Sequence, residues 1–399
     1  MSESKLNSTF GSFHLIGKAI ISDKTFSIDN MNKSNTWQYS HVSMGINCGE
    51  KYGTIFIEKM GGHNPKESSV KYCSTKNEDG TIKKGKENQI SISWENRFDE
   101  IDFNKVSDSQ MFKTGFRDAE GKIEQKTFVF EEDFIKYIAE NVKNDDVVSV
   151  RGHLEYYRDP ETGDVSVKKV VDHFFLSNVK EEHFKANFEL QAYVDSGTFG
   201  KLNREDNNVA LYFKVASFVN KINDKKYNQV GCYSIKVIWN LKNFDLTKTE
   251  DQKKIVAQTQ KFFKPEKNMV HLITIGGHFV EGAGITEVKP EDFSKEIQNA
   301  LESGLLSMDE LTGTALNGKS RTKEMYYDTV KTYLEDNTVH FHFTENIMKE
   351  EDLVFVQDLQ PIEDSAPSST SNSETTNAED AEPDEISSDL MAELFGGIS

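Results

Sequence analysis

A long bent β-hairpin, encoded by residues 144–179, limits more than any other stretch what this chain can fold into. Its first strand opens with Val147, Val148 and Val150 and is interrupted by Gly152. Residues 159–163 form a turn by composition, because proline presets φ and glycine supplies positive φ. A valine-rich partner strand follows. Since a glycine inside a strand marks a bulge or sharp bend, the stretch predicts a small sheet that curls into a barrel.

The first half of the chain places other elements around this hairpin. Alternating or apolar runs at 13–20, 37–47 and 53–60 predict three strands. Residues 67–121 are irregular, with a short strand at 90–94, and residues 130–142 carry apolar side chains at helical spacing behind three acidic residues. Three strands, a helix and two strands are the element order of an OB-fold, a five-stranded Greek-key barrel.

The second half repeats this order at low identity. Thr198-Phe199 echoes Thr25-Phe26, and Gly277-His278 echoes Gly152-His153. The remaining predicted elements are strands at 188–194, 209–219, 233–239 and 270–280, a helix at 252–263, closing strands at 339–343 and 353–356, and inserted helices at 290–301 and 323–334.

The predicted fold class is mainly β with inserted helices: two OB-fold-like five-stranded barrels in tandem plus a disordered acidic C-terminal tail. The first domain spans 1–182 with an insertion at 61–127, and the second spans 183–360 with a helical insertion at 282–337. The tail, 361–399, is rich in Ser, Thr, Asn and Glu and cannot offset the entropy of ordering itself. Its end differs, because residues 386–395 place apolar side chains at helical spacing among acidic ones.

Composition excludes several classes of protein. Three scattered cysteines without a CxxC pair fit reduced thiols rather than a disulfide framework or a zinc knuckle. The N-terminus has no signal-peptide pattern, and no apolar run approaches the length of a membrane span. The sequence therefore predicts a soluble protein of the cytoplasm, or of the host cytoplasm if a phage encodes it.

No catalytic constellation emerges, so we expect neither an enzyme nor a cofactor. The chain has no GxGxxG after a strand, no HExxH and no GxSxG. Lys319-Ser320 lacks the glycine and the leading strand of a phosphate-binding loop. His340 and His342 share a strand face without an acidic or thiol partner, which favours surface histidines over a metal site.

Aromatic residues interleaved with basic ones give the stronger signal. Bases stack on any aromatic face, and nearby Lys or Arg tracks the phosphates, which gives sequence-tolerant binding of a single strand. Barrels also need aromatic residues for their cores, so alternation turns about half of such a set inward. The candidates are Trp37, Tyr39, Lys51, Tyr52, Lys59, Arg151, Tyr156, Tyr157 and Arg158 in the first unit, and Lys214, Lys226, Tyr227, Tyr233, Lys236 and Trp239 in the second.

The charge of the chain opposes that signal at first sight. There are 66 acidic and 47 basic residues, a net charge of −19. Residues 361–399 hold ten acidic residues and no Lys or Arg, and removing those ten charges from −19 leaves −9 on the rest. Any nucleic-acid surface must therefore be a local basic groove. The tail is either a competitor for that groove or a solubilising appendage, and its apolar tip favours a docking peptide for partner proteins.

Paired OB-like units, a Ser/Glu-rich linker and an acidic tip with hydrophobic residues resemble single-stranded DNA-binding proteins. The Lys/Asn/Asp-rich composition and long insertions are most similar to versions encoded by large bacteriophages. The resemblance implies docking of replication, recombination or repair proteins on the tip. The chain departs from the bacterial pattern, because no Pro-Phe ends it, so partner identity is not carried over. The partner-binding residues would be Asp389, Leu390, Met391, Glu393, Leu394 and Phe395.

We therefore expect a protein that coats and protects single-stranded DNA during replication, recombination or repair and recruits partners through its C-terminus. Two alternatives stay open: a phage structural or assembly protein built from OB-like interaction modules, and an OB-type module that binds RNA or a peptide. Exposed Tyr and Trp lined with Lys or Arg would favour nucleic acid, whereas a flat apolar patch would favour assembly. The sequence does not fix the oligomeric state.

Overall fold

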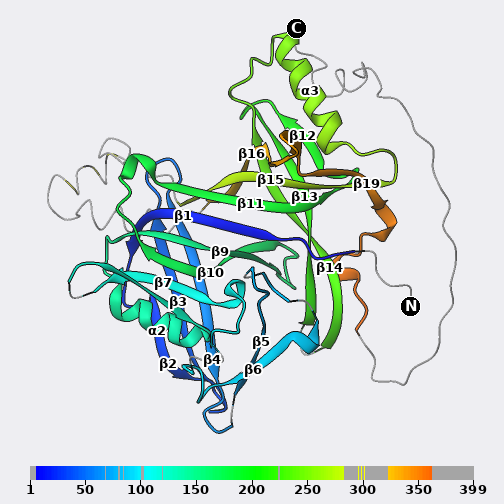
Figure 1. Cartoon of the computed structure of the whole chain (residues 1–399). Helices are drawn as coiled ribbons and strands as arrows, with labels where there is room; N and C mark the ends of the chain where they lie inside the picture. Colours follow the sequence, from blue (N-terminus) through cyan, green and yellow to red (C-terminus); the bar gives the residue numbers. More distant parts are fainter. Residues whose placement is uncertain are drawn as a thin grey trace, which may run out of the picture.

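A computed structural model of the chain shows a mainly β protein with two long helices in the part that it describes (Figure 1). It describes residues 6–282 except 68, 80, 84, 100–102, 119, 223 and 224, then residues 295, 298 and 301, and residues 322–361. The expected tail, its tip and most of the predicted helix at 290–301 lie outside these residues.

The first barrel closes through five strands. They pair in the order β1-β3-β4-β10-β9 and back to β1, and the β4–β10 contact is parallel while the others are antiparallel. With α2 between the third and fourth of these strands, this is the OB-fold topology. The bounds are β1 Gly11–Ile20, β3 Gln38–Asn47, β4 Thr54–His63, α2 Glu131–Asn141, β9 Val147–Arg158 and β10 Val165–Leu176.

The second barrel closes in the same way. Its order is β11-β13-β14-β16-β15 and back to β11, with a parallel β14–β16 contact and α3 between the third and fourth strands. The predicted tandem of OB-fold barrels is therefore confirmed. The bounds are β11 Lys185–Val194, β13 Asn208–Ile222, β14 Lys225–Asn240, α3 Thr249–Phe263, β15 Met269–Gly282 and β16 Thr322–Val330.

The glycines that the sequence matched occupy equivalent places. Gly152 of β9 lies opposite Phe13, and Gly277 of β15 lies opposite Phe188. A Cβ on either glycine would clash with that ring and with a carbonyl oxygen of the next strand. Both positions therefore need glycine for close packing of strand, ring and backbone.

A His–Asp pair is also repeated. His153 Nδ1 lies 2.6 Å from the carboxylate of Asp172, and His278 Nδ1 lies 2.9 Å from that of Asp328. Each aspartate falls at a register shift between the last two strands of its barrel. A bulge places one extra residue, here the aspartate, outside the regular pairing of the strand. The histidine on the facing strand then contacts its carboxylate.

The two Thr-Phe echoes close the same turn. The backbone N–H of Ser22 donates to Thr25 Oγ1 at 2.9 Å, and that of Asp195 donates to Thr198 Oγ1 at 2.9 Å. Both threonines are buried and their carbonyls accept bonds from the second strand of the barrel. These turns lead into the short edge strands β2 (Phe26–Met31) and β12 (Phe199–Asn203).

The barrels are joined directly. β1 and β11 pair antiparallel with Phe13 opposite its counterpart Phe188, so both barrels belong to one continuous sheet. Across the junction Lys169 of β10 forms an ion pair with Glu281 of β15, and the two side chains are 5% and 4% exposed. Glu281 Oε2 also accepts a bond from the Phe56 backbone N–H of the first barrel at 3.2 Å. The junction is thus held by backbone and by a buried charge pair.

Two predictions about the end of the second barrel are wrong. Residues 323–334 are not a helix, because β16 occupies Thr322–Val330. Met325, Tyr327 and Val330 are buried there, and the step of two between the first pair is a strand period.

Residues 339–343 and 353–356 do not close the barrel. The first range covers part of the small hairpin of β17 (Thr332–Glu335) with β18 (Thr338–Phe341), and β19 (Phe343–Lys349) pairs with β15.

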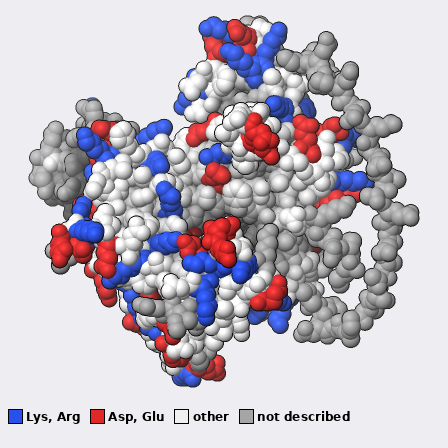
Figure 2. Space-filling view, viewed as in Figure 1, with Lys and Arg blue, Asp and Glu red and all other residues white. Residues whose placement is uncertain are grey.

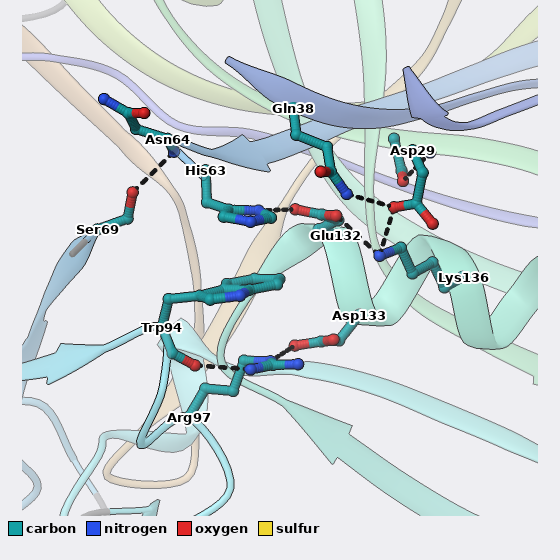
Figure 3. A network of polar contacts seen from close by, with 11 residues as sticks. Asp29, Gln38, His63, Asn64, Ser69, Trp94, Arg97, Glu132, Asp133 and Lys136 are labelled. Carbon is teal, nitrogen blue, oxygen red and sulfur yellow. Dashed lines mark hydrogen bonds and ion pairs between the residues drawn. The ribbon is translucent and has the colours of Figure 1, made fainter. Parts of the chain in front are cut away.

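The first-barrel insertion adds strands β5 to β8 and is anchored on α2 (Figure 3). His63 Nδ1 lies 2.7 Å from Glu132 of α2, which is buried. The Trp94 ring stacks on His63 at 3.9 Å, and the Arg97 guanidinium covers its other side while donating to Asp133. The strand bounds are β5 Val70–Ser74, β6 Gln89–Ser93, β7 Phe112–Arg117 and β8 Ile123–Phe128.

Candidate nucleic-acid interface

The hairpin of β13 and β14 carries exposed rings and exposed lysines. Tyr212 is exposed and lies directly opposite Lys236. Phe218, six residues further along the same face, is 59% exposed. Beyond it Lys221 lies opposite Lys226 near the end of the hairpin. This set, called here the second-barrel platform, lies on strands two and three of an OB barrel, the face that such barrels use for oligonucleotides.

The lysines of this platform are electrostatically available. Lys221, Lys226 and Lys236 are exposed, and none forms an ion pair with another described residue. Lys225, next to the turn, shares both properties. Because each ammonium is free to approach a phosphate without first leaving a carboxylate, this hairpin is a local basic element on an acidic protein.

The platform is not one unbroken surface. Between Tyr212 and Phe218 the outward residue Ala216 is buried, as is Cys232 opposite it. Both belong to a small second core with Leu6 and Leu353. The segments around Leu6 and Leu353 thus cover the middle of the hairpin and leave its two ends exposed.

The first-barrel hairpin tip lies beside this platform. Tyr157 is 50% exposed, while its neighbour Tyr156 points the other way and packs with its ring centroid 5.9 Å from that of Tyr233 on β14. Arg158 is half-buried and approaches Gly163, whose φ is +78°. The structure therefore brings Tyr156, Tyr157 and Tyr233, expected on separate platforms, to one junction.

Tyr156 itself is a junction residue. Burial raises the pKa of its hydroxyl, and the oxygen makes no hydrogen bond to another described residue. The same ring covers Gly11 of β1, where a Cβ would meet its hydroxyl at 2.6 Å. Its position does not support the prediction of a base-stacking role.

Three predicted contact residues are buried. Trp239 is 4% exposed and packs edge-on against Phe263 of α3, 5.7 Å between centroids. Lys59 donates to Asp172 at 3.2 Å, and Lys214 donates to Asp195 at 2.6 Å. These side chains are occupied inside the protein rather than presented at its surface.

The other predicted residues are dispersed. Trp37 is exposed and Tyr39 half-buried at the start of β3, and Lys51 lies 4.8 Å from the ring centroid of half-buried Tyr52. Tyr227 is half-buried near the β14 turn. Residues 389–395 of the tail lie outside the described part of the chain. Trp37 and Tyr39 thus form a separate edge of the first barrel.

Arg151 lines a cavity of about 550 Å³ across the β1–β11 junction. His14 and Lys331 also line it. Burial lowers the pKa of His14 to about 4, and the charges of Lys185 and Arg151 add to that shift. The acidic wall residue Glu189 is paired with Lys331 at 3.0 Å.

Several exposed rings were not predicted. Phe10, Tyr72 and Phe98 are prominent at the surface, and the last two lie in the insertion. Val70 and Tyr72 lie two positions apart in the short strand β5 and are both exposed. This spacing is the one local signal in the sequence from which an exposed ring could have been predicted there.

Within the described residues no group of His, Cys, Asp and Glu could hold a metal ion. None of the described helices is both long and apolar enough to cross a membrane.

Comparisons with known proteins add little. No protein-family model matches the chain, and no curated protein matches it. Among solved structures, the chain is similar to a deletion mutant of the single-stranded DNA binding protein from Thermus aquaticus, with 7% identity and a TM-score of 0.33 over 83% of this chain and 98% of that one. The wild-type form of that protein matches with 8% identity and a TM-score of 0.29 over 69% and 87%. TM-scores this low carry no argument about function, so the function of the chain is inferred from the geometry of the described residues alone.

Proposed function

We propose that the chain binds single-stranded nucleic acid, with DNA as the expected ligand, and catalyses no reaction. The observation that carries the proposal is the second-barrel platform. Exposed Tyr212 and Phe218 share a face of the β13–β14 hairpin with Lys236, and exposed Lys221 and Lys226 follow near its turn. None of these lysines is ion-paired with a described residue. A ring beside a free cation is the pairing that stacks a base and neutralises its phosphate.

The junction would allow one nucleic-acid strand to contact both barrels. Tyr157 and Arg158 lie at the hairpin tip that packs on β14, so a nucleic-acid strand that extends beyond the second-barrel platform would contact them next.

The finer assignments are part of the same proposal. The chain divides into units 1–182 and 183–360 followed by the tail 361–399, and it serves replication, recombination or repair through partners recruited by Asp389, Leu390, Met391, Glu393, Leu394 and Phe395. A cytoplasmic location and a phage origin are further expectations from composition.

Anisotropy of a labelled oligothymidine of ~30 nucleotides tests the proposal, since that length covers two OB units. A labelled strand is preferable to tryptophan quenching, because Trp239 is buried, Trp94 is stacked between His63 and Arg97, and exposed Trp37 lies on a separate edge of the first barrel. The full chain and a chain ending at Gln360 are compared at low and moderate salt, with oligouridine in parallel. We expect salt-sensitive binding that tightens without the tail.

Phe218→Ala provides the site-specific arm, with Ile123→Ser on the exposed face of β8 as the matched control. Loss of one stacked base costs about 1–3 kcal/mol, roughly 5- to 150-fold in Kd. If neither chain form binds at low salt, the proposal fails and an assembly protein becomes the better interpretation. Tighter binding of oligouridine would replace DNA by RNA.

A further inference from the structure

The sheet that joins the two barrels carries a row of polar side chains on its outer face. Strands β10, β9, β1, β11 and β15 lie side by side in that order (Figure 1). The neighbours of the row in the sequence include Phe13, Phe174 and Phe188, which are buried, so alternation turns the row away from the core. The row, one residue from each strand and each directly opposite the next, is His173, Arg151, His14, Asn187 and His278.

The middle of this row lines the cavity of about 550 Å³ at the β1–β11 junction, called here the junction cavity. His14, Arg151, Asn187 and Glu189 are among its lining residues. The volume falls in the range of small-molecule sites, about 300–1,000 Å³. The cavity lies mainly on the first, fourth and fifth strands of the first barrel and on the first strand of the second. It is therefore separate from the second-barrel platform, which lies on strands two and three.

The sign of surface charge does not by itself locate a binding site on this protein. Lys and Arg side chains are interspersed with Asp and Glu over the face drawn in Figure 2. Pairing is more informative, because every carboxylate that lines the junction cavity has a cation partner. The pairs are Asp108 with Lys113 at 3.5 Å, Asp172 with Lys59 at 3.2 Å and Glu189 with Lys331 at 3.0 Å.

Arg151 is the lining cation without such a partner. Its side chain is exposed and forms no ion pair with another described residue. Lys185, two residues from Asn187 on β11, forms none either. Burial and then the charges of Lys185 and Arg151 lower the pKa of His14 to about 4, so its imidazole is neutral at pH 7. The cavity thus has positive charge that no described carboxylate neutralises.

We propose that the junction cavity binds a phosphate group, with Arg151 as the anchoring cation. The planar guanidinium matches the oxygens of a phosphate, which it can bind through two parallel hydrogen bonds. His14 and Asn187, directly opposite each other beside it, can add N–H donors. The expected ligand is a phosphodiester of single-stranded nucleic acid. That identity rests on the proposed function, whereas the binding of a phosphate group does not.

The salt dependence of oligothymidine binding tests whether a phosphate of the strand occupies the cavity. Each phosphate contact with a single strand contributes about 0.7 to the slope of log K against log salt. Arg151→Gln should lower that slope by about 0.7 and raise Kd about 5- to 10-fold at low salt. Lys122→Gln removes one charge from an exposed lysine between β7 and β8 that has no ion pair with a described residue, and it should change neither quantity.

A gain of binding provides a second arm, since a misfolded variant cannot produce it. Glu189→Gln releases Lys331 from its ion pair and adds a second unpaired cation to the cavity. Kd should fall about 5-fold, and the slope should rise by about 0.7. Glu140→Gln removes an exposed acidic charge from α2 and serves as the matched control, with no change expected.

Inorganic phosphate tests the cavity without nucleic acid. Histidine side-chain resonances of the full chain are followed by NMR at pH 7 as phosphate is added, and His14→Gln identifies the His14 signal. We expect this signal to move with phosphate but not with chloride at the same ionic strength. In Arg151→Gln the signal should stay fixed. Circular dichroism confirms that each variant is folded.

Two results would overturn the proposal. A His14 signal that moves equally with phosphate and chloride removes the phosphate site. Equal Kd and equal slope in the parent and Arg151→Gln remove the strand as its ligand, and a free phosphate or nucleotide takes its place where the His14 signal responds. If oligothymidine does not bind at all, the proposed function fails, whereas the response to inorganic phosphate still decides whether the cavity holds an anion.

Discussion

The two barrels share their internal constraints and differ at their surfaces. Each has a glycine under a phenylalanine, a histidine paired with a bulged aspartate and a threonine that begins an edge strand. Each barrel turns one lysine of its second or third strand inward, Lys59 to Asp172 and Lys214 to Asp195. The second barrel differs because its third strand also leaves Lys226 and Lys236 exposed. The two barrels thus share the residues that close the barrel, and they differ in which charged side chains they expose to solvent.

The largest expected effect is at the junction that ties the two barrels together. Lys169→Met leaves Glu281 buried without its cation, which costs about 3–5 kcal/mol of unfolding free energy. Lys169→Met with Glu281→Gln removes both charges and should recover a large part of that loss. Urea denaturation measures both. A single variant as stable as the parent would show that the barrels do not depend on this pair.

The equivalence of the two glycines comes next. Gly152→Ala and Gly277→Ala each place a Cβ against a ring and a carbonyl oxygen, so each should destabilise the protein by about 1–3 kcal/mol or more. Thermal and urea unfolding of the two variants should agree in size. A large loss for one and none for the other would break the internal symmetry inferred from strand pairing.

A third test asks which barrel contributes more to binding. Phe218→Ala should weaken oligothymidine binding by about 1–3 kcal/mol, and Tyr157→Ala by less, because Tyr157 lies at the junction and Phe218 beside free lysines. Both side chains are well exposed, so stability should hardly change. The reverse order of effects would move the centre of the proposed surface to the first barrel.

The smallest effect is a pH dependence of the first barrel. Hydrogen bonds to Asp172 and then Glu155 raise the pKa of His153 to about 9 from its ordinary 6.5. The stabilisation from protonated His153 is therefore complete below about pH 6.5 and is lost as pH rises through about 9. Since the imidazole is partly exposed, screening keeps the effect under about 1 kcal/mol. His153→Gln should flatten that part of the stability–pH profile, and an unchanged profile would contradict it.

The sequence was most informative where a residue type has one structural use. Gly152, Gly277 and the Thr-Phe pairs predicted the repeat because a close approach needs glycine and a turn needs a short hydroxyl side chain. The prediction of a helix at 323–334 was wrong because the spacing of Met325, Tyr327, Val330 and Leu334 fits the helical period nearly as well as the strand period. This segment is a strand because it pairs with β15, whose residues lie 40 to 55 positions earlier in the chain.

The candidate site was less predictable, because the direction of a side chain depends on distant partners. Lys59 and Lys214 occur in stretches where basic and aromatic residues alternate, which predicted surface positions. Both side chains are instead buried, because they form ion pairs with Asp172 and Asp195. Trp239 follows Ile235 and Val237 at a step of two, and stricter use of that alternation would have placed it in the core. Tyr156 was unpredictable, since its environment exists only after two barrels meet.

The β1–β11 ladder has a consequence for spacing along a bound strand. Two domains on a peptide linker behave like beads on a string, and the length they protect varies with the linker. Here backbone hydrogen bonds fix one barrel against the other, so the distance between their surfaces is a property of the fold. A nuclease footprint should then have one sharp length at all salt concentrations that permit binding, and the protein would act as a ruler as well as a cover.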